Sequence, residues 1–149
     1  MPVFARMIFG LVNFAARKGL RNDAASARQT GIRGETYAYW FLRRHGYIMI
    51  ARNFIVPGIK GEIDLVGYDG PVLAFIEVKT RAAASEAFGK PEEAVTPEKR
   101  RNLSRMARHF LAERRIAEAT CRFDVLAIES RPGRRPVVRL HRGAFGAAD

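Results

Sequence analysis

Cysteine is almost missing from this chain of 149 residues, in which Cys121 is the one residue of its type. A single thiol excludes an intramolecular disulfide framework and a zinc site made of several thiolates. We therefore expect a reducing, cytoplasmic environment, and we expect Cys121 to be a small side chain buried in the core.

Acidic residues are few relative to basic ones. The chain has 15 Asp and Glu against 26 Lys and Arg, which gives a formal net charge of +11. A field of this sign concentrates polyanions, so nucleic acid is the leading expected partner. An anionic membrane surface would respond to the same field, and charge alone does not decide between the two.

Long hydrophobic runs are also lacking. Residues 1–16 come closest, but Arg6 and Asn13 interrupt the run, which is too short to span a bilayer. The larger apolar side chains follow helical spacing and predict an amphipathic helix: Val3, Phe4, Met7, Ile8, Leu11, Val12 and Phe14. Docking on the domain or self-association into a homodimer is favoured over membrane contact through residues 3–14.

The domain organisation follows from where apolar periodicity begins. Residues 18–33 are polar, small and basic without such periodicity, which predicts a linker. The chain then divides into an N-terminal helix with a basic linker, residues 1–30, and one compact domain, residues 31–149. With 48% apolar residues, this length suffices for one hydrophobic core.

Turn residues and periodicity predict two helices and five strands in the compact domain. The helices are expected at residues 33–45, ending before Gly46, and 97–115, capped by Thr96. The strands are expected at residues 47–56, 62–68, 72–80, 121–128 and 137–141. The strand 72–80 is apolar almost throughout, as a strand in the middle of a sheet would be, so its two charged residues need a reason.

These two residues, Glu77 and Lys79, lie on one face of the strand because side chains alternate along it. The preceding strand carries Asp64, and a tight turn that pairs Val72 with residue 67 or 68 would bring Asp64 into the neighbourhood of Ile76 and Glu77. An acidic pair with a lysine beside it is therefore expected at this place in the sheet.

Glu35, from the first predicted helix, can bring a third carboxylate to the same place. Converging carboxylates repel one another unless protons or a cation neutralise them, and only Lys79 is expected to offset them here. Hard oxygen ligands favour Mg²⁺ or Mn²⁺. With such an ion the site could hydrolyse phosphodiesters, and Lys79 would orient the water or offset charge in the transition state.

A simpler interpretation makes Glu77 and Lys79 an ordinary ion pair and Asp64 a solvated residue at a sheet edge. The buried position of the pair argues against it, because an isolated buried charge costs several kcal/mol without partners. From spacing alone, the two interpretations are about equal.

The motif of Asp64, twelve residues, then Glu77-Val78-Lys79 resembles the signature of the PD-(D/E)XK nuclease superfamily. More closely, the chain resembles the YraN-like family of small bacterial proteins from about residue 31 to residue 145. This resemblance rests on Gly34-Glu35, Gly61-Glu62-Ile63-Asp64, Phe75-Ile76-Glu77-Val78-Lys79-Thr80-Arg81, Phe88-Gly89, Lys99, and Arg122-Phe123-Asp124.

The resemblance implies an α/β fold with a central mixed β-sheet flanked by helices, similar to Holliday-junction resolvases and restriction endonucleases. It also implies that the catalytic residues are Glu35, Asp64, Glu77 and Lys79, the three carboxylates being the metal ligands. Ile63 stands where the superfamily motif has proline, a position that varies across the superfamily.

Several basic residues follow the candidate site and could bind phosphates: Arg81, Lys99, Arg100, Arg101 and Arg105. The other interpretation is a solvated helix surface. No aromatic residues alternate with these basic ones in the sequence, so recognition of the nucleic-acid backbone or its shape is expected, with DNA favoured over RNA.

Other polar residues have plainer interpretations. Glu62 shares a strand face with Asp64 and is either an outer ligand or a solvated residue. For Asp124 a structural role, such as pairing with Arg122, is favoured. The histidines lack metal-ligand spacing.

The sequence thus predicts a metal-dependent endonuclease acting on DNA, branched forms included. The alternative is a nucleic-acid-binding or protein-interaction module that keeps the scaffold with little or no catalysis, because a fold does not dictate a function.

Overall fold

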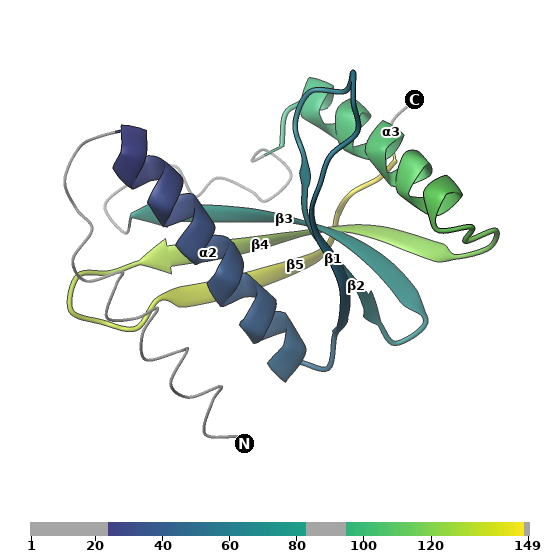
Figure 1. Cartoon of the computed structure of the whole chain (residues 1–149). Coiled ribbons are helices and arrows are strands. Elements are labelled where there is room, and N and C mark those ends of the chain that lie inside the picture. The colour runs from purple at the N-terminus through teal and green to yellow at the C-terminus, as the bar shows by residue number, and fades with distance from the viewer. Residues whose placement is uncertain (1–23, 83–94, 148–149) are drawn as a thin grey trace.

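The computed structural model describes residues 24–82 and 95–147 (Figure 1). The amphipathic helix expected at residues 1–16 and most of the loop expected before Thr96 lie outside these ranges. Within them, no helix is long and apolar enough to cross a membrane.

The described residues form an α/β fold in which a five-stranded mixed sheet packs between two helices. In chain order the elements are α2 (Ala24–Arg44), β1 (Ile48–Phe54), β2 (Ile63–Asp69), β3 (Val72–Ala82), α3 (Pro97–Glu113), β4 (Thr120–Ser130) and β5 (Val137–Phe145). The strands lie in sequence order across the sheet, and only the β3–β4 pair is parallel. The predicted mixed sheet and the central place of the 72–80 strand are confirmed.

Helix α2 begins earlier than the sequence predicted. The segment 18–33 was expected to be a linker, but residues from Ala24 onward are helical. Alanine favours a helix even without an apolar stripe, so periodicity missed this first part. The end of the helix was predicted correctly, since Gly46 has a φ of 88°.

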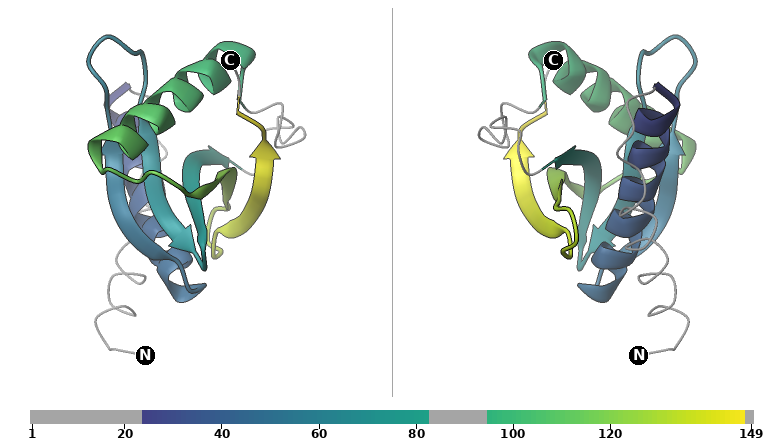
Figure 2. Two further views of the ribbon diagram at one scale, coloured as in Figure 1. Left: turned by 90° about the vertical axis from the view of Figure 1, so that its right-hand side faces the viewer. Right: turned by 90° about the vertical axis from the view of Figure 1, so that its left-hand side faces the viewer.

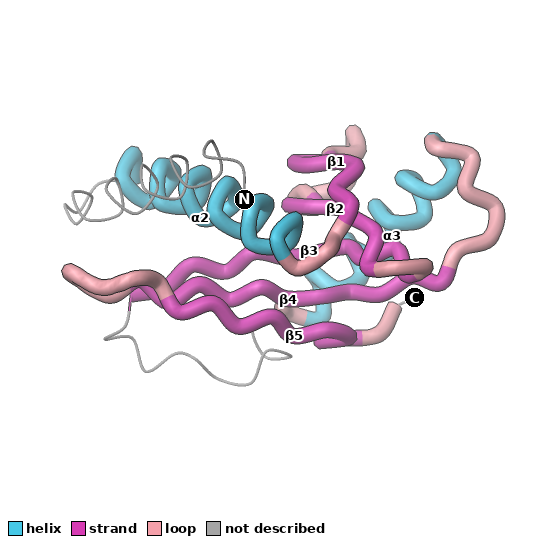
Figure 3. Tube along the Cα trace, turned by 90° about the horizontal axis from the view of Figure 1, so that it is seen from below, coloured by secondary structure: helices cyan, strands magenta, loops and turns pink. Residues whose placement is uncertain are grey.

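The two helices cover opposite faces of the sheet, as the side views show (Figure 2). On one face Ala38 and Leu42 of α2 pack on inward side chains of β2, β3 and β4, including Leu65 and Ile76. On the other face α3 buries Met106 and Phe110 and the neighbouring apolar side chains of its stripe against Leu73, Phe75, Phe123 and Val125. Seen from below, α2 runs along the sheet over β3 and β4 (Figure 3).

A close approach sets the height of α2 above β3. A Cβ atom at Gly34 would collide with Oγ1 of Thr80, so only glycine fits there. The next residue, Glu35, is thereby held near the strands.

The β2–β3 register differs from the predicted one. Val72 pairs with Asp69 and not with residue 67 or 68, because the turn between the strands is shorter than expected. The ladder ends at Leu65 and Ile76. The next position along each strand is Asp64 and Glu77, so the corrected register still brings these residues together.

A second group of charged residues, the arginine cluster, consists of Tyr47, Asp69, Arg122, Asp124 and Arg142. Asp124 is fully buried, and Arg122 donates to both of its carboxylate oxygens, at 2.7 and 2.9 Å. Oδ1 of Asp124 also accepts a hydrogen bond from the backbone N–H of Gly143. The predicted pairing of Asp124 with Arg122 is confirmed.

The prediction that Cys121 is buried in the core was wrong. It lies near the start of β4 and is exposed, because the apolar part of this strand begins only at Phe123.

Candidate metal centre

Asp64 stands at the start of β2, where this strand separates from β3. Its side chain is 7% exposed, and its Oδ2 accepts a hydrogen bond from the backbone N–H of Val78 at 2.8 Å. The carboxylate thus contacts a backbone donor of β3 just beyond the last residue pair of the ladder. This contact fixes the side chain at the junction of the two strands.

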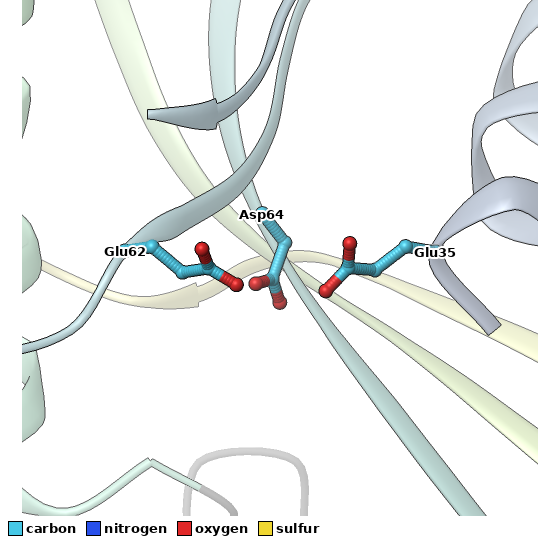
Figure 4. Close-up of side chains that lie close together, drawn as sticks. All are labelled: Glu35, Glu62 and Asp64. Carbon is cyan, nitrogen blue, oxygen red and sulfur yellow. The ribbon is translucent and has the colours of Figure 1, made fainter. Parts of the chain in front are cut away.

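Two further carboxylates face Asp64. Glu35 comes from α2 and Glu62 from the residue before β2, and Figure 4 shows Asp64 between them. One carboxylate oxygen of each residue lies within 4.8 Å of the others. Glu35 thus lies where the sequence predicted it, and Glu62 joins the group as more than a solvated residue.

Glu77 completes what we call the acidic cluster, Glu35, Glu62, Asp64 and Glu77. It follows Leu73 and Phe75 on the face of β3 that α3 covers, and its side chain is 5% exposed. Lys79 Nζ lies 3.5 Å from Oε1 of Glu77, and Lys99 donates a hydrogen bond to the same oxygen. The other oxygen, Oε2, is buried and has no hydrogen-bond partner among the described residues.

The crowding of negative charge changes the acidity of the cluster. Burial, and then the charge of Glu77, raises the pKa of Asp64 from 3.8 to about 8, although the hydrogen bond from Val78 opposes this shift. Burial and then the charge of Glu62 raise the pKa of Glu35 as well, and Arg52 opposes them. Burial and neighbouring negative charge thus favour the protonated form of Asp64 and, in the same direction, of Glu35.

Lys99 is the residue of this site that the sequence did not predict. It was expected on a phosphate-binding helix surface, but its ammonium contacts Glu77. The side chain of Thr96 accepts a hydrogen bond from the backbone N–H of Lys99, which fixes the first turn of α3 beside β3. Burial lowers the pKa of Lys99, but the charge and hydrogen bond of Glu77 outweigh this effect and raise it overall.

The donor set fits a divalent cation. A buried carboxylate oxygen with no partner is costly unless a ligand satisfies it, and Oε2 of Glu77 is such an atom. Asp64 and Glu35 have raised pKa values that a cation would lower again. Hard oxygen donors suit Mg²⁺ or Mn²⁺ and argue against a softer metal.

The predicted phosphate-binding residues fall into two groups. Arg101 and Arg105 are exposed on α3. Arg100 donates to the backbone oxygen of Val95 and lies over the ring of Phe145, and Arg81 is half-buried near the end of β3. With Lys99 at the acidic cluster, Arg101 and Arg105 remain as the two of the five that face solvent.

Comparison with known proteins gives one family. A family model described as "Uncharacterised protein family UPF0102" matches residues 34–128. A UPF0102 protein of Koribacter versatilis is 46% identical over 125 residues, which cover 83% of each chain. Another, of Symbiobacterium thermophilum, is 46% identical over 121 residues, 81% of this chain and 99% of the relative. A third, of Geotalea uraniireducens, is 37% identical over 126 residues, 85% of this chain and 96% of the relative.

Proposed function

This chain belongs to the protein family UPF0102, which confirms the resemblance to the YraN-like family. We propose that its acidic cluster is the active site of a Mg²⁺- or Mn²⁺-dependent endonuclease. One observation carries the proposal: Oε2 of Glu77 is buried without a partner among the described residues, beside Asp64. The ion pairs with Lys79 and Lys99 involve only Oε1, so they leave Oε2 for another ligand.

Asp64, Glu77 and Glu35 would hold the ion, and Glu62 lies close enough to Asp64 and Glu35 to share in binding it. A bound divalent ion would supply Lewis-acid polarisation of a phosphoryl oxygen and would lower the pKa of a water molecule. Lys79 lies beside Glu77 and offsets negative charge that develops on the phosphate. Its removal should slow cleavage by about 10² to 10⁴.

Nucleic acid is the substrate class that fits the surroundings. The net charge is +11, and Arg101 and Arg105 present guanidinium groups on the helix that carries Lys99 into the site. Such groups reach phosphates and read no base sequence, so recognition through the backbone or shape of DNA is proposed.

Cleavage of labelled linear, flapped and four-way DNA with Mg²⁺ or Mn²⁺ tests the proposal. Asp64→Ala and Glu77→Ala should each abolish cleavage and leave DNA binding intact, because they remove metal ligands and no phosphate-binding group. Glu129→Gln is the matched control, since Glu129 pairs with Arg131 outside the acidic cluster. Full activity in either alanine variant would refute the site.

A binding module without catalysis is the second candidate. It is favoured by the two lysines at Glu77, which neutralise this carboxylate without any metal ion. Metal-independent DNA binding with no cleavage of any substrate in the set would support it.

A further inference from the structure

The two lysines that contact Glu77 come from different elements and differ in exposure. Lys79 belongs to β3, two residues from Glu77 on the same face of the strand, and is 28% exposed. Lys99 reaches the same oxygen from another element, the first turn of α3, and is 37% exposed. Of the two, Lys99 is the more exposed and makes the closer contact with Oε1, so its withdrawal toward solvent would change the surroundings of the carboxylate more.

We propose that Lys99 is a built-in competitor for the cation: its ammonium takes Oε1 of Glu77 in the metal-free protein and has to withdraw from this carboxylate when a divalent ion binds. The inference rests on the proposed metal site. It adds a residue on α3 that sets the affinity of that site.

Charge is the first argument. Glu77 carries one negative charge, and two ammonium groups already lie against its Oε1. A divalent ion that takes the remaining oxygen, Oε2, would share the carboxylate with both of them at short range, beside a Glu77 side chain that is only 5% exposed. Like charges at this separation repel strongly where the effective dielectric constant is low.

Geometry is the second argument. The backbone of Lys99 is fixed by the Thr96 cap, and the buried side chain of Val95 anchors the chain just before it. The helix therefore does not have to move for the ammonium to leave. A lysine side chain has four rotatable bonds, so a change of rotamer is enough.

The competition can be measured without substrate. Binding of Mn²⁺, followed by the paramagnetic resonance signal of the free ion, should be about tenfold tighter in Lys99→Met than in the wild type. Without metal, the same variant should melt at a lower temperature, because Glu77 then has one partner fewer. Its melting temperature should then rise more on Mn²⁺ addition than that of the wild type.

Two matched variants separate competition from a general loss of charge. Arg108→Gln removes one positive charge from an exposed position on the same helix and should leave Mn²⁺ affinity unchanged. Lys99→Arg keeps the charge at Glu77 and should also bind Mn²⁺ as the wild type does. Circular dichroism confirms that each variant is folded, and Lys99→Gln replaces Lys99→Met if that variant is not.

Unchanged or weaker Mn²⁺ binding in Lys99→Met would overturn the inference, while cleavage and Mn²⁺ binding by the wild type would keep the proposed function. Equal tightening in Arg108→Gln would also overturn it, because a nonspecific field would then suffice. If neither the wild type nor Lys99→Met binds Mn²⁺, the proposed metal site fails and the inference fails with it.

Discussion

The acidic cluster and the arginine cluster are two groups of charged residues around buried carboxylates of one sheet, and the partners of those carboxylates differ. In the arginine cluster both oxygens of Asp124 accept hydrogen bonds from Arg122, and Arg122 and Arg142 each contact Asp69. In the acidic cluster the carboxylates of Glu35, Glu62 and Asp64 lie within 4.8 Å of one another. Lys79 and Lys99 both contact Oε1 of Glu77, and Oε2 of Glu77 has no partner among the described residues. The buried carboxylate of the first group is satisfied by the protein itself, whereas the second group leaves a buried acceptor without a partner among the described residues.

The acidities show the same difference. Hydrogen bonding by Arg122 lowers the pKa of Asp69, whereas burial raises that of Asp64 to about 8. A completed network stabilises the charged form of its carboxylate, and the acidic cluster destabilises it. A protein keeps such a cluster at a cost in stability, which is typical of a functional site.

The largest expected effect comes from breaking the completed network. Arg122→Met leaves the buried Asp124 without its main partner and should lower the free energy of unfolding by about 3 to 5 kcal/mol, with no change in Mn²⁺ affinity. Urea unfolding measures this change. Arg134→Met, on the exposed turn after β4, is the control and should cost less than about 0.5 kcal/mol. A small effect of Arg122→Met would mean that the arginine cluster is not a stabilising network.

The next effect is a pH dependence of stability in the acidic cluster. The pKa of Asp64 is raised on folding, so its contribution to stability is fully present below about pH 4 and is lost as the pH rises to about 8. The melting temperature, measured in the presence of a chelator, should therefore fall as the pH rises over this range in the wild type. It should fall less in Asp64→Asn. The asparagine can still accept the hydrogen bond from Val78. An equal change of melting temperature with pH in the two proteins would contradict the raised pKa of Asp64.

Sequence patterns predicted those parts of this picture that depend on local rules. The strands, the Thr96 cap, the Gly46 end of α2 and the shared face of Glu77 and Lys79 all follow from periodicity and turn residues. The predicted register of β2 on β3 was wrong. The observed ladder ends at Leu65 and Ile76, so Asp64 and Glu77 are the next positions along the two strands and still lie near each other.

The contacts between distant elements were not predictable in the same way. Lys99 reaches Glu77 only because α3 docks with its first turn beside β3, and no local pattern states where a helix docks. The exposure of Cys121 depends on where the core ends along β4. The early start of α2 was missed because alanine forms helices without leaving an apolar period.

The smallest expected effect concerns positive charge. The arginines of the arginine cluster are held by carboxylates, whereas Arg101 and Arg105 are exposed on α3. Replacing Arg101 and Arg105 by Gln should reduce the slope of log affinity for DNA against log salt by about 0.9 for each phosphate that the protein no longer neutralises. The double variant Arg134→Gln/Arg135→Gln, which removes the same charge from the turn after β4, should change the slope less. If both double variants show the same salt dependence of DNA affinity, the DNA-binding surface does not lie on α3.

The central claim, that the acidic cluster is completed by a divalent ion and the arginine cluster by the protein, is tested most directly by melting with and without Mn²⁺. At about a hundredfold excess over the dissociation constant, Mn²⁺ should stabilise the wild type by roughly 2.7 kcal/mol, or roughly 5 to 10 °C. Asp69→Asn, which removes a carboxylate from the arginine cluster, should keep this shift, and Asp64→Asn should lose most of it. Equal shifts in all three proteins would contradict the claim, because the ion would then bind elsewhere.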